Sequence, residues 1–148
     1  MEETKPILTS NRAEKPWRPN DTLLERGRRL QQKQLRRPGM LTVQQFARAE
    51  GTSERRVRFE LARPCSKWLM LGTRGMAPRM PAWKSSRAHE WLIRELRKHG
   101  RGLDVWTIYW ALDARLPGLG DERPIDVIAW KNRRRVLSAV LSAQSFHS

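Results

Sequence analysis

Three arginine side chains stand close together in residues 41–61, LTVQQFARAEGTSERRVRFEL. Arg55, Arg56 and Arg58 follow Ser53 in the first turns of a predicted helix, and Glu54 lies among them. A guanidinium group stays charged at any physiological pH, and its planar fork of N–H donors matches phosphate oxygens and the acceptor edges of bases. The spacing therefore predicts a surface that makes hydrogen bonds to an anionic polymer.

The residues around these arginines are those that a tight turn between two helices needs. Ala47 is small enough for a close helix crossing, and Gly51 accepts a left-handed backbone without steric cost. Ser53 is a good N-cap for the second helix. Apolar contacts at helical spacing come from Val43, Phe46, Val57 and Leu61. This pattern predicts a helix-turn-helix motif whose second helix faces a DNA major groove; two surface helices joined by a glycine are the alternative.

Net charge supports a polyanionic partner. The chain has 148 residues, enough for one or two small domains, with a formal net charge of +15 and a pI of about 11.5. Such an excess of positive charge repels itself unless a polyanion neutralises it, which makes double-stranded DNA the first partner to consider. We expect no membrane partner, because no stretch approaches the roughly 20 apolar residues of a membrane span.

Cysteine and histidine usage indicates neither disulfides nor a metal. The single Cys65 excludes an internal disulfide framework and fits a cytoplasmic protein associated with the nucleoid. The N-terminus, MEETKPILTS, lacks the pattern of a signal peptide. His89, His99 and His147 are scattered, so we expect no metal site and no cofactor.

Basic residues are concentrated in the first part of the chain. Residues 1–84 hold 19 Lys and Arg against 8 Asp and Glu, whereas residues 85–148 hold 11 against 7. We therefore predict a flexible basic arm at 1–19, a DNA-binding domain at 20–84, and a helical dimerisation or partner-binding domain at 85–148. The arm either follows the DNA or is a solvated tail without a role.

A helix and a hairpin are predicted to flank the motif. A helix at 20–37 carries a thin stripe of leucines, which favours packing onto the motif over a dimer contact. Two apolar runs, 67–71 and 76–83, surround a glycine-containing turn and predict a β-hairpin that forms a wing. Pro78 and Pro81 limit its second strand to an edge or an irregular run. Further DNA contacts are predicted at Arg74, Lys67 and Arg79; the alternative is a linker anchored by Trp68 and Trp83.

The second part of the chain is predicted to be helical and rich in tryptophan. We expect helices at 85–99, 105–112, 125–130 and 132–143, with Asp104 capping the second and Asn132 the last. The helix at 105–112 is densely aromatic, which is typical of a buried core but also of a partner-binding surface. The candidates for a partner or dimer contact are Trp106, Tyr109, Trp110, Leu119, Pro124 and Ile125.

The order of motifs in residues 81–140 resembles the C-terminal domain of the Xre/MbcA/ParS-type antitoxins. That domain carries a loop of the type Pro-x-Leu-Gly-Gly-x-x-Pro-Leu-Asp-Leu-Leu, and the positions that match are Pro117, Leu119, Gly120, Pro124 and Asp126. Asp121 stands in place of the second glycine. The resemblance implies a mainly α-helical protein in which a helix-turn-helix precedes a domain that dimerises and holds a RES-domain toxin. It further implies an autorepressor that binds the operator of its own operon.

Other functions are less consistent with the sequence, and some remain as alternatives. An enzyme is not expected, because the chain has no glycine-rich phosphate loop, no serine elbow and no Cys–His pair close in sequence. Its aspartates after Asp21 fall at helix starts or in loops, where capping explains them. The alternatives within binding proteins are a DNA-binding regulator or DNA-organising protein of a plasmid or mobile element that has no toxin, and an RNA-binding protein.

Overall fold

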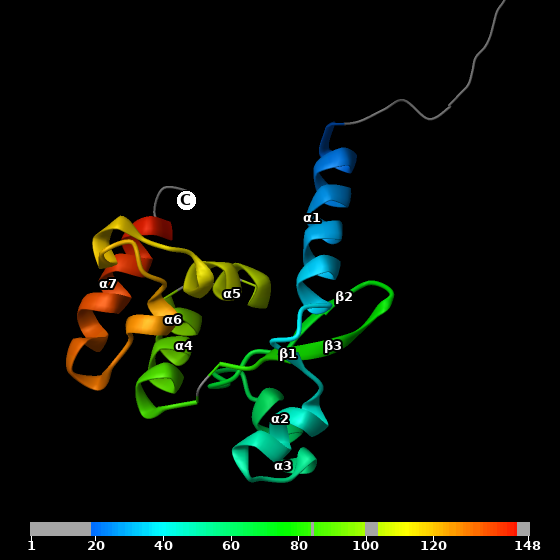
Figure 1. The fold of residues 1–148 in the computed structure, drawn as a ribbon, viewed down its shortest axis with the longest axis horizontal. Helices are drawn as coiled ribbons and strands as arrows, with labels where there is room; N and C mark the ends of the chain where they lie inside the picture. Colours follow the sequence, from blue (N-terminus) through cyan, green and yellow to red (C-terminus); the bar gives the residue numbers. More distant parts are fainter. Residues whose placement is uncertain (1–18, 84, 100–103, 145–148) are drawn as a thin grey trace, which may run out of the picture.

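The computed structural model describes residues 19–83, 85–99 and 104–144, and these form a mainly α-helical protein with a small antiparallel sheet (Figure 1). The predicted mainly α class is thereby confirmed. The predicted basic arm, apart from its last residue Pro19, lies outside the described residues. The α-helices are α1 (Pro19–Leu35), α2 (Val43–Glu50), α3 (Glu54–Leu61), α4 (Arg87–His99), α5 (Val105–Asp113), α6 (Pro124–Val127) and α7 (Arg133–Gln144). Two 3-10 helices, η1 (Pro117–Leu119) and η2 (Trp130–Asn132), and three strands, β1 (Met40–Leu41), β2 (Leu71–Thr73) and β3 (Met76–Pro81), complete the described elements. No helix in these ranges is long and apolar enough to cross a bilayer.

Local hydrogen bonds define both ends of the turn between α2 and α3. Thr42 and Gln45 form a reciprocal capping box at the start of α2, with N···O distances of 2.9 and 3.0 Å. Gly51 ends α2 with a left-handed φ of 70°. The Ser53 hydroxyl then accepts from the Arg56 N–H at 3.1 Å and caps α3. The predicted roles of Gly51 and Ser53 are confirmed, and the capping box is an additional device of the same local kind.

The sheet has the strand order β1-β3-β2, with all neighbours antiparallel. The predicted hairpin is confirmed, but its first strand begins only at Leu71. Of the two alternatives predicted for the second strand, the edge position is wrong, because the short β1 pairs with β3 on its other side, but the irregular run is present as a register shift between β2 and β3. The prolines are tolerated there for local reasons. Pro78 lies opposite Gly72, where the β2–β3 register shifts, and Pro81 is the last residue of its strand.

Buried apolar side chains form two clusters. The smaller one joins α2 and α3 to the sheet and consists of Val43, Phe46, Ala47, Val57 and Met80. The larger one covers α4 to α7 and also takes in Leu35, Met40, Leu69 and Leu71 from the first part of the chain. Elements on both sides of residue 84, where we predicted a domain boundary, therefore share one core. In Figure 1, α2 and α3 lie below the sheet and α4 to α7 lie beside it.

The first helix contacts the hairpin and extends beyond the body of the protein (Figure 1). Its last residue, Leu35, is buried, but Leu23, Leu24 and Leu30 are 61, 67 and 60% exposed. The prediction that the leucine stripe packs onto the helix-turn-helix residues is wrong: α1 packs against β2 and β3 instead. The stripe was too thin to cover a neighbouring helix, and only its C-terminal end reaches a core.

The last two predicted helices have different ends from those expected. The helix expected at 125–130 ends at Val127, since Ile128 already has an extended backbone. Asn132 does not cap α7. Its side chain accepts from the Ala129 N–H at 2.7 Å and donates to the Val127 carbonyl at 2.9 Å, which closes the short η2 turn. Pro124 begins α6, where its missing N–H costs nothing.

Candidate nucleic-acid interface

Helix α3 has a buried face and a solvent face. Val57 is fully buried and Glu60 is 8% exposed, and both turn towards α2 and the loop that follows α3. At about 100° per residue, Arg55, Arg58 and Phe59 project from the opposite side of the helix. All three are exposed. The arginines that the sequence singled out therefore lie on the accessible face of a helix that is held in place through its other face.

The guanidinium groups of Arg55 and Arg56 are available to a ligand. Both side chains are exposed, and neither group forms a hydrogen bond or ion pair with another described residue. Arg58 is different, because its Nη2 and Nε lie 2.9 and 3.2 Å from Oε2 of Glu54, one turn earlier. An exposed pair of this kind is worth only about 0.2–1 kcal/mol, so a phosphate can replace Glu54 as the partner of Arg58.

Ser53 and Glu54, both predicted to contact DNA, have structural tasks in the free protein. The Ser53 Oγ is occupied as the cap of α3. Glu54 is the first residue of the helix, where its negative charge interacts favourably with the positive end of the helix dipole. They set the direction of α3 and the position of Arg58. Direct contact with an anion falls to the arginines.

A buried glutamate fixes the loop that follows α3. Glu60 Oε2 accepts from the backbone N–H of Lys67 at 2.9 Å, and its Oε1 accepts from Arg63 Nη1 at 3.2 Å. From α4, Arg97 Nη2 donates to the Trp68 carbonyl at 2.9 Å. Burial lowers the pKa of Arg97, and the nearby Cys65 and Glu60 partly offset that effect. These bonds tie the end of α3 to the larger core.

Lys67 lies between α3 and α4 rather than beside the hairpin turn. Its Nζ is 3.7 Å from a carboxylate oxygen of Glu90 and 4.9 Å from the centre of the Trp68 ring. The groove around it, of about 480 Å³, is also lined by Glu50 and Glu60. Desolvation and the charge of Glu90 raise the pKa of Glu50 in this acidic surrounding. Lys67 therefore shares this groove with Arg56 and Phe59 of α3, but Glu90 partly neutralises its charge.

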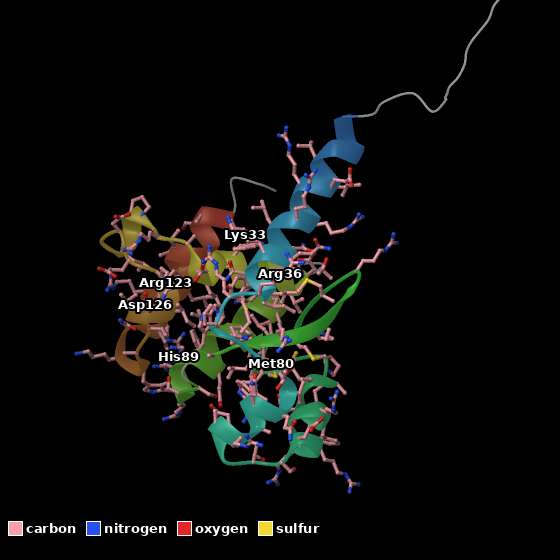
Figure 2. The ribbon with its side chains drawn as sticks, turned by 45° about the vertical axis from the view of Figure 1, so that its right-hand side comes forward. Lys33, Arg36, Met80, His89, Arg123 and Asp126 are labelled. Carbon is pink, nitrogen blue, oxygen red and sulfur yellow. The ribbon has the colours of Figure 1, made fainter. Side chains whose placement is uncertain are left out.

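The hairpin turn lies beside α1. Arg74 is exposed at the turn, where Gly75 has a φ of 84°, and its carbonyl accepts from Gln32 Nε2 at 3.4 Å. Arg79 is half-buried on β3, opposite Leu71. Figure 2 shows Lys33 on α1 and Arg36 just after the end of that helix. Arg74 thus joins the basic residues of α1, and the structure gives it no contact with α3.

Five of the six residues predicted for a partner surface are buried in the larger core. Trp106, Leu119 and Ile125 are each 6% exposed, Tyr109 is 3% exposed, and Pro124 is fully buried. Trp110 is the exception at 38%. The interpretation of the aromatic helix as core is therefore confirmed for most of α5. A contact surface made of the five buried residues would require the core to open.

Hydrogen bonds of the buried aromatic residues connect α5 with the first part of the chain. Trp106 Nε1 donates to the Gly72 carbonyl at 2.8 Å. The Tyr109 hydroxyl accepts from Gln34 Nε2, and its ring stacks on Trp83 with 5.0 Å between ring centres. Burial raises the pKa of Tyr109 to about 12, and the nearby Asp113 adds to the shift. These contacts position the hairpin and α1 on the larger core.

The loop between α5 and α6 is rigidly bonded. Gly120 and Asp121 both have left-handed backbones, with φ of 67 and 64°. Arg123 reaches Asp113 at 2.6 Å and Asp126 at 2.7 and 2.9 Å, and Figure 2 shows Arg123 and Asp126 side by side. Hydrogen bonding to Arg123 lowers the pKa of Asp126. Since Asp104 caps α5 at 2.8 Å, three of the chain's later aspartates have a clear structural partner.

Sequence reasoning missed one residue of the α3 surface. Phe59 is 72% exposed, and with Ser53, Arg55 and Arg56 it lines a shallow hollow of about 360 Å³. The signal was present, because Phe59 follows Arg55 by four residues and must share its helix face, while Val57 and Leu61 already supply the buried face.

Comparisons with protein-family models, with curated proteins and with solved structures gave no match for this chain.

Proposed function

We propose that this chain is a sequence-specific DNA-binding protein and that α2, the turn at Gly51 and α3 act as a helix-turn-helix motif. The observation that carries the proposal is the pair of exposed, unpartnered guanidinium groups of Arg55, on the solvent face of the capped helix α3, and Arg56, on its flank. In this motif, the first turns of the second helix contact base edges and the first helix crosses the backbone.

Electrostatics supports duplex DNA as the ligand. The formal net charge of +15 provides long-range attraction to a polyanion, and each arginine that meets a phosphate releases a bound counterion. RNA is the competing ligand. The described tryptophans are largely taken up by packing within the protein, for example Trp106 and Trp83 in the larger core, so they offer few stacking platforms for single-stranded bases. Retention on duplex DNA exceeding that on structured RNA at matched salt supports the proposal, and the reverse order supports the RNA-binding alternative.

The proposal includes a homodimer, because a single helix-turn-helix usually binds its half-site too weakly alone. The buried aromatic residues do not supply its surface. The exposed apolar groups proposed for it are Trp110 and three leucines of α1, Leu23, Leu24 and Leu30, in agreement with the dimer contact considered for that helix. A monomer in light scattering at micromolar concentration contradicts this part of the proposal.

Repression of its own operon and neutralisation of a RES-domain toxin are proposed on the resemblance alone. The conformation of the 117–128 loop supports the resemblance: Asp121, which replaces the second glycine, has the left-handed backbone that a glycine would adopt. The burial of Leu119, Pro124 and Ile125 favours the alternative of a regulator without a toxin. Co-expression with a RES toxin encoded beside this gene separates the two, since only an antitoxin restores growth.

The decisive test replaces the arginines of α3. If Arg55 reads a base, we expect Arg55→Ala to weaken specific binding by about 1–3 kcal/mol. If Arg55 contacts phosphate, the slope of log affinity against log salt concentration should fall in magnitude by about one. The triple replacement of Arg55, Arg56 and Arg58 by Ala should abolish specific retention in a gel-shift titration.

A matched control removes the same charge elsewhere. Lys131, Arg134 and Arg135 are exposed on η2 and α7, and their joint replacement by Ala lowers the net charge by the same amount. This variant should keep its sequence preference and lose only non-specific affinity. If the α3 variant binds as the wild type does, α3 is not the DNA-reading helix.

A further inference from the structure

An aromatic side chain stands in the middle of the cationic face of α3. Phe59 is 72% exposed, the most exposed of the large apolar side chains in the described residues. It follows Arg55 by one helical turn, and it shares a hollow with Ser53, Arg55 and Arg56. A benzyl group that is neither buried nor capped by neighbours gains free energy from any partner that removes it from water.

The surroundings of Phe59 restrict the chemistry of that partner. The other large apolar side chains that are exposed in the described ranges lie on α1 and α5; beside Phe59, the half-buried Trp68 lines a groove that also holds Arg56, Lys67 and Glu60, so charged groups surround the apolar surface. A hydrophobic protein surface laid over it would strip water from Arg55 and Arg56 without supplying anions. A partner that fits must present negative or acceptor groups around one small apolar group.

The major groove of DNA presents that combination. Phosphates and base acceptors suit the arginines, and the C5 methyl group of thymine is the apolar group on the base edges of this groove. We propose that Phe59 packs on a thymine methyl group and makes α3 selective for an A·T pair at that position. This inference rests on the proposed function of α3 and adds a specificity determinant to it.

The position of the thymine follows from helix geometry. Four residues of α-helix advance by about 6 Å, and base pairs are stacked about 3.4 Å apart. The thymine read by Phe59 therefore lies within about two base pairs of the base or phosphate that Arg55 contacts. The contacts of Arg55 and Phe59 therefore fall in the same half-site.

The experiment starts with selection of binding sites by the full-length protein from a random duplex library. Each enriched thymine is then replaced by deoxyuridine, which removes only the methyl group. At one position in each half-site, we expect the wild type to lose roughly 3- to 10-fold in affinity, as for one buried methyl group. Placing 5-methylcytosine at that position, paired with guanine, restores the methyl group and tests it apart from the base pair.

Variants connect the effect to Phe59. Phe59→Ala should bind the thymine and deoxyuridine duplexes equally, and Phe59→Leu should keep part of the difference. Arg134→Ala, an exposed position on α7 outside the proposed reading and dimer surfaces, should keep all of it. Because Phe59 is exposed, the variants are expected to unfold at the wild-type temperature; should Phe59→Ala not fold, the Leu variant still gives the comparison.

The outcomes separate this inference from the function on which it rests. If the wild type is not retained on duplex DNA at low salt, the proposed function fails. If it binds but selection enriches no thymine, or deoxyuridine is tolerated at every position, only the reading by Phe59 is overturned. The reading by Phe59 is also overturned if Phe59→Ala distinguishes the thymine duplex from the deoxyuridine duplex as the wild type does. It is overturned as well if the ring inserts between bases as a wedge, because affinity then does not depend on the methyl group.

Discussion

The two apolar clusters of this protein differ in size and in the way they hold their helices. The cluster under α2 and α3 contains five buried residues, whereas the one around α4 to α7 contains 18. The proposed DNA-reading helices have only eight residues each, too short to be stable alone, and the outward face of α3 is cationic. They are kept in place by caps at Thr42, Gly51 and Ser53 and by Met80 from the sheet, which Figure 2 shows near α2. The α2–α3 unit therefore depends mainly on local bonds, whereas the global stability depends on the larger cluster.

The largest expected effect comes from the larger cluster. Leu112 is fully buried on α5, so Leu112→Ala should lower the free energy of unfolding by about 2–5 kcal/mol through lost burial and a cavity. Leu24→Ala, at a site 67% exposed, should change it by no more than about 0.5 kcal/mol. Urea titrations followed by tryptophan fluorescence measure both. Equal costs for the two variants would mean that the larger cluster does not dominate stability.

A somewhat smaller effect is expected from Tyr109, which connects the larger cluster with α1. Its pKa is raised to about 12 in the folded protein, so its contribution to stability is complete below pH 10 and is lost as the pH rises towards 12. A shift of this size corresponds to about 2–3 kcal/mol. Tyr109→Phe lacks the titrating group, so the stability difference between wild type and variant should shrink across this pH range. A constant difference would show that the hydroxyl titrates alike in both states.

The elements that the sequence predicted well are those defined by local chemistry. Ser53 and Asp104 cap helices because a short side-chain oxygen reaches the next turn, and Gly51 turns because it lacks a Cβ; such effects need no knowledge of distant residues. The densely aromatic α5 is also core in the way its composition indicates.

Most of the errors concern contacts between residues far apart in the chain; the end of the helix expected at 125–130 and the cap expected at Asn132 are local errors. Lys67 was assigned to the wing, but Glu60 and Glu90 hold it beside α4. The two-residue β1 carries no sequence signal of its own and exists because it pairs with β3. The outward position of Phe59 was readable from its spacing to Arg55, but apolar type alone suggested burial.

The smallest effect tests whether local bonds indeed hold the α2–α3 unit. Gly51 and Gly27 both have open space where a Cβ would stand, but only Gly51 has a left-handed backbone. Gly51→Ala should therefore destabilise the protein by about 1 kcal/mol through backbone strain, whereas Gly27→Ala, inside α1, should stabilise it by about 0.5–1 kcal/mol. Because both variants make the same Gly→Ala change, opposite signs of the change in the free energy of unfolding isolate the contribution of the backbone conformation. If the α2–α3 unit opens by itself, amide hydrogen exchange in Gly51→Ala should quicken at Val57 and stay unchanged at Leu92 and Leu112. Faster exchange at all three would show instead that the small cluster and the large one unfold as one unit.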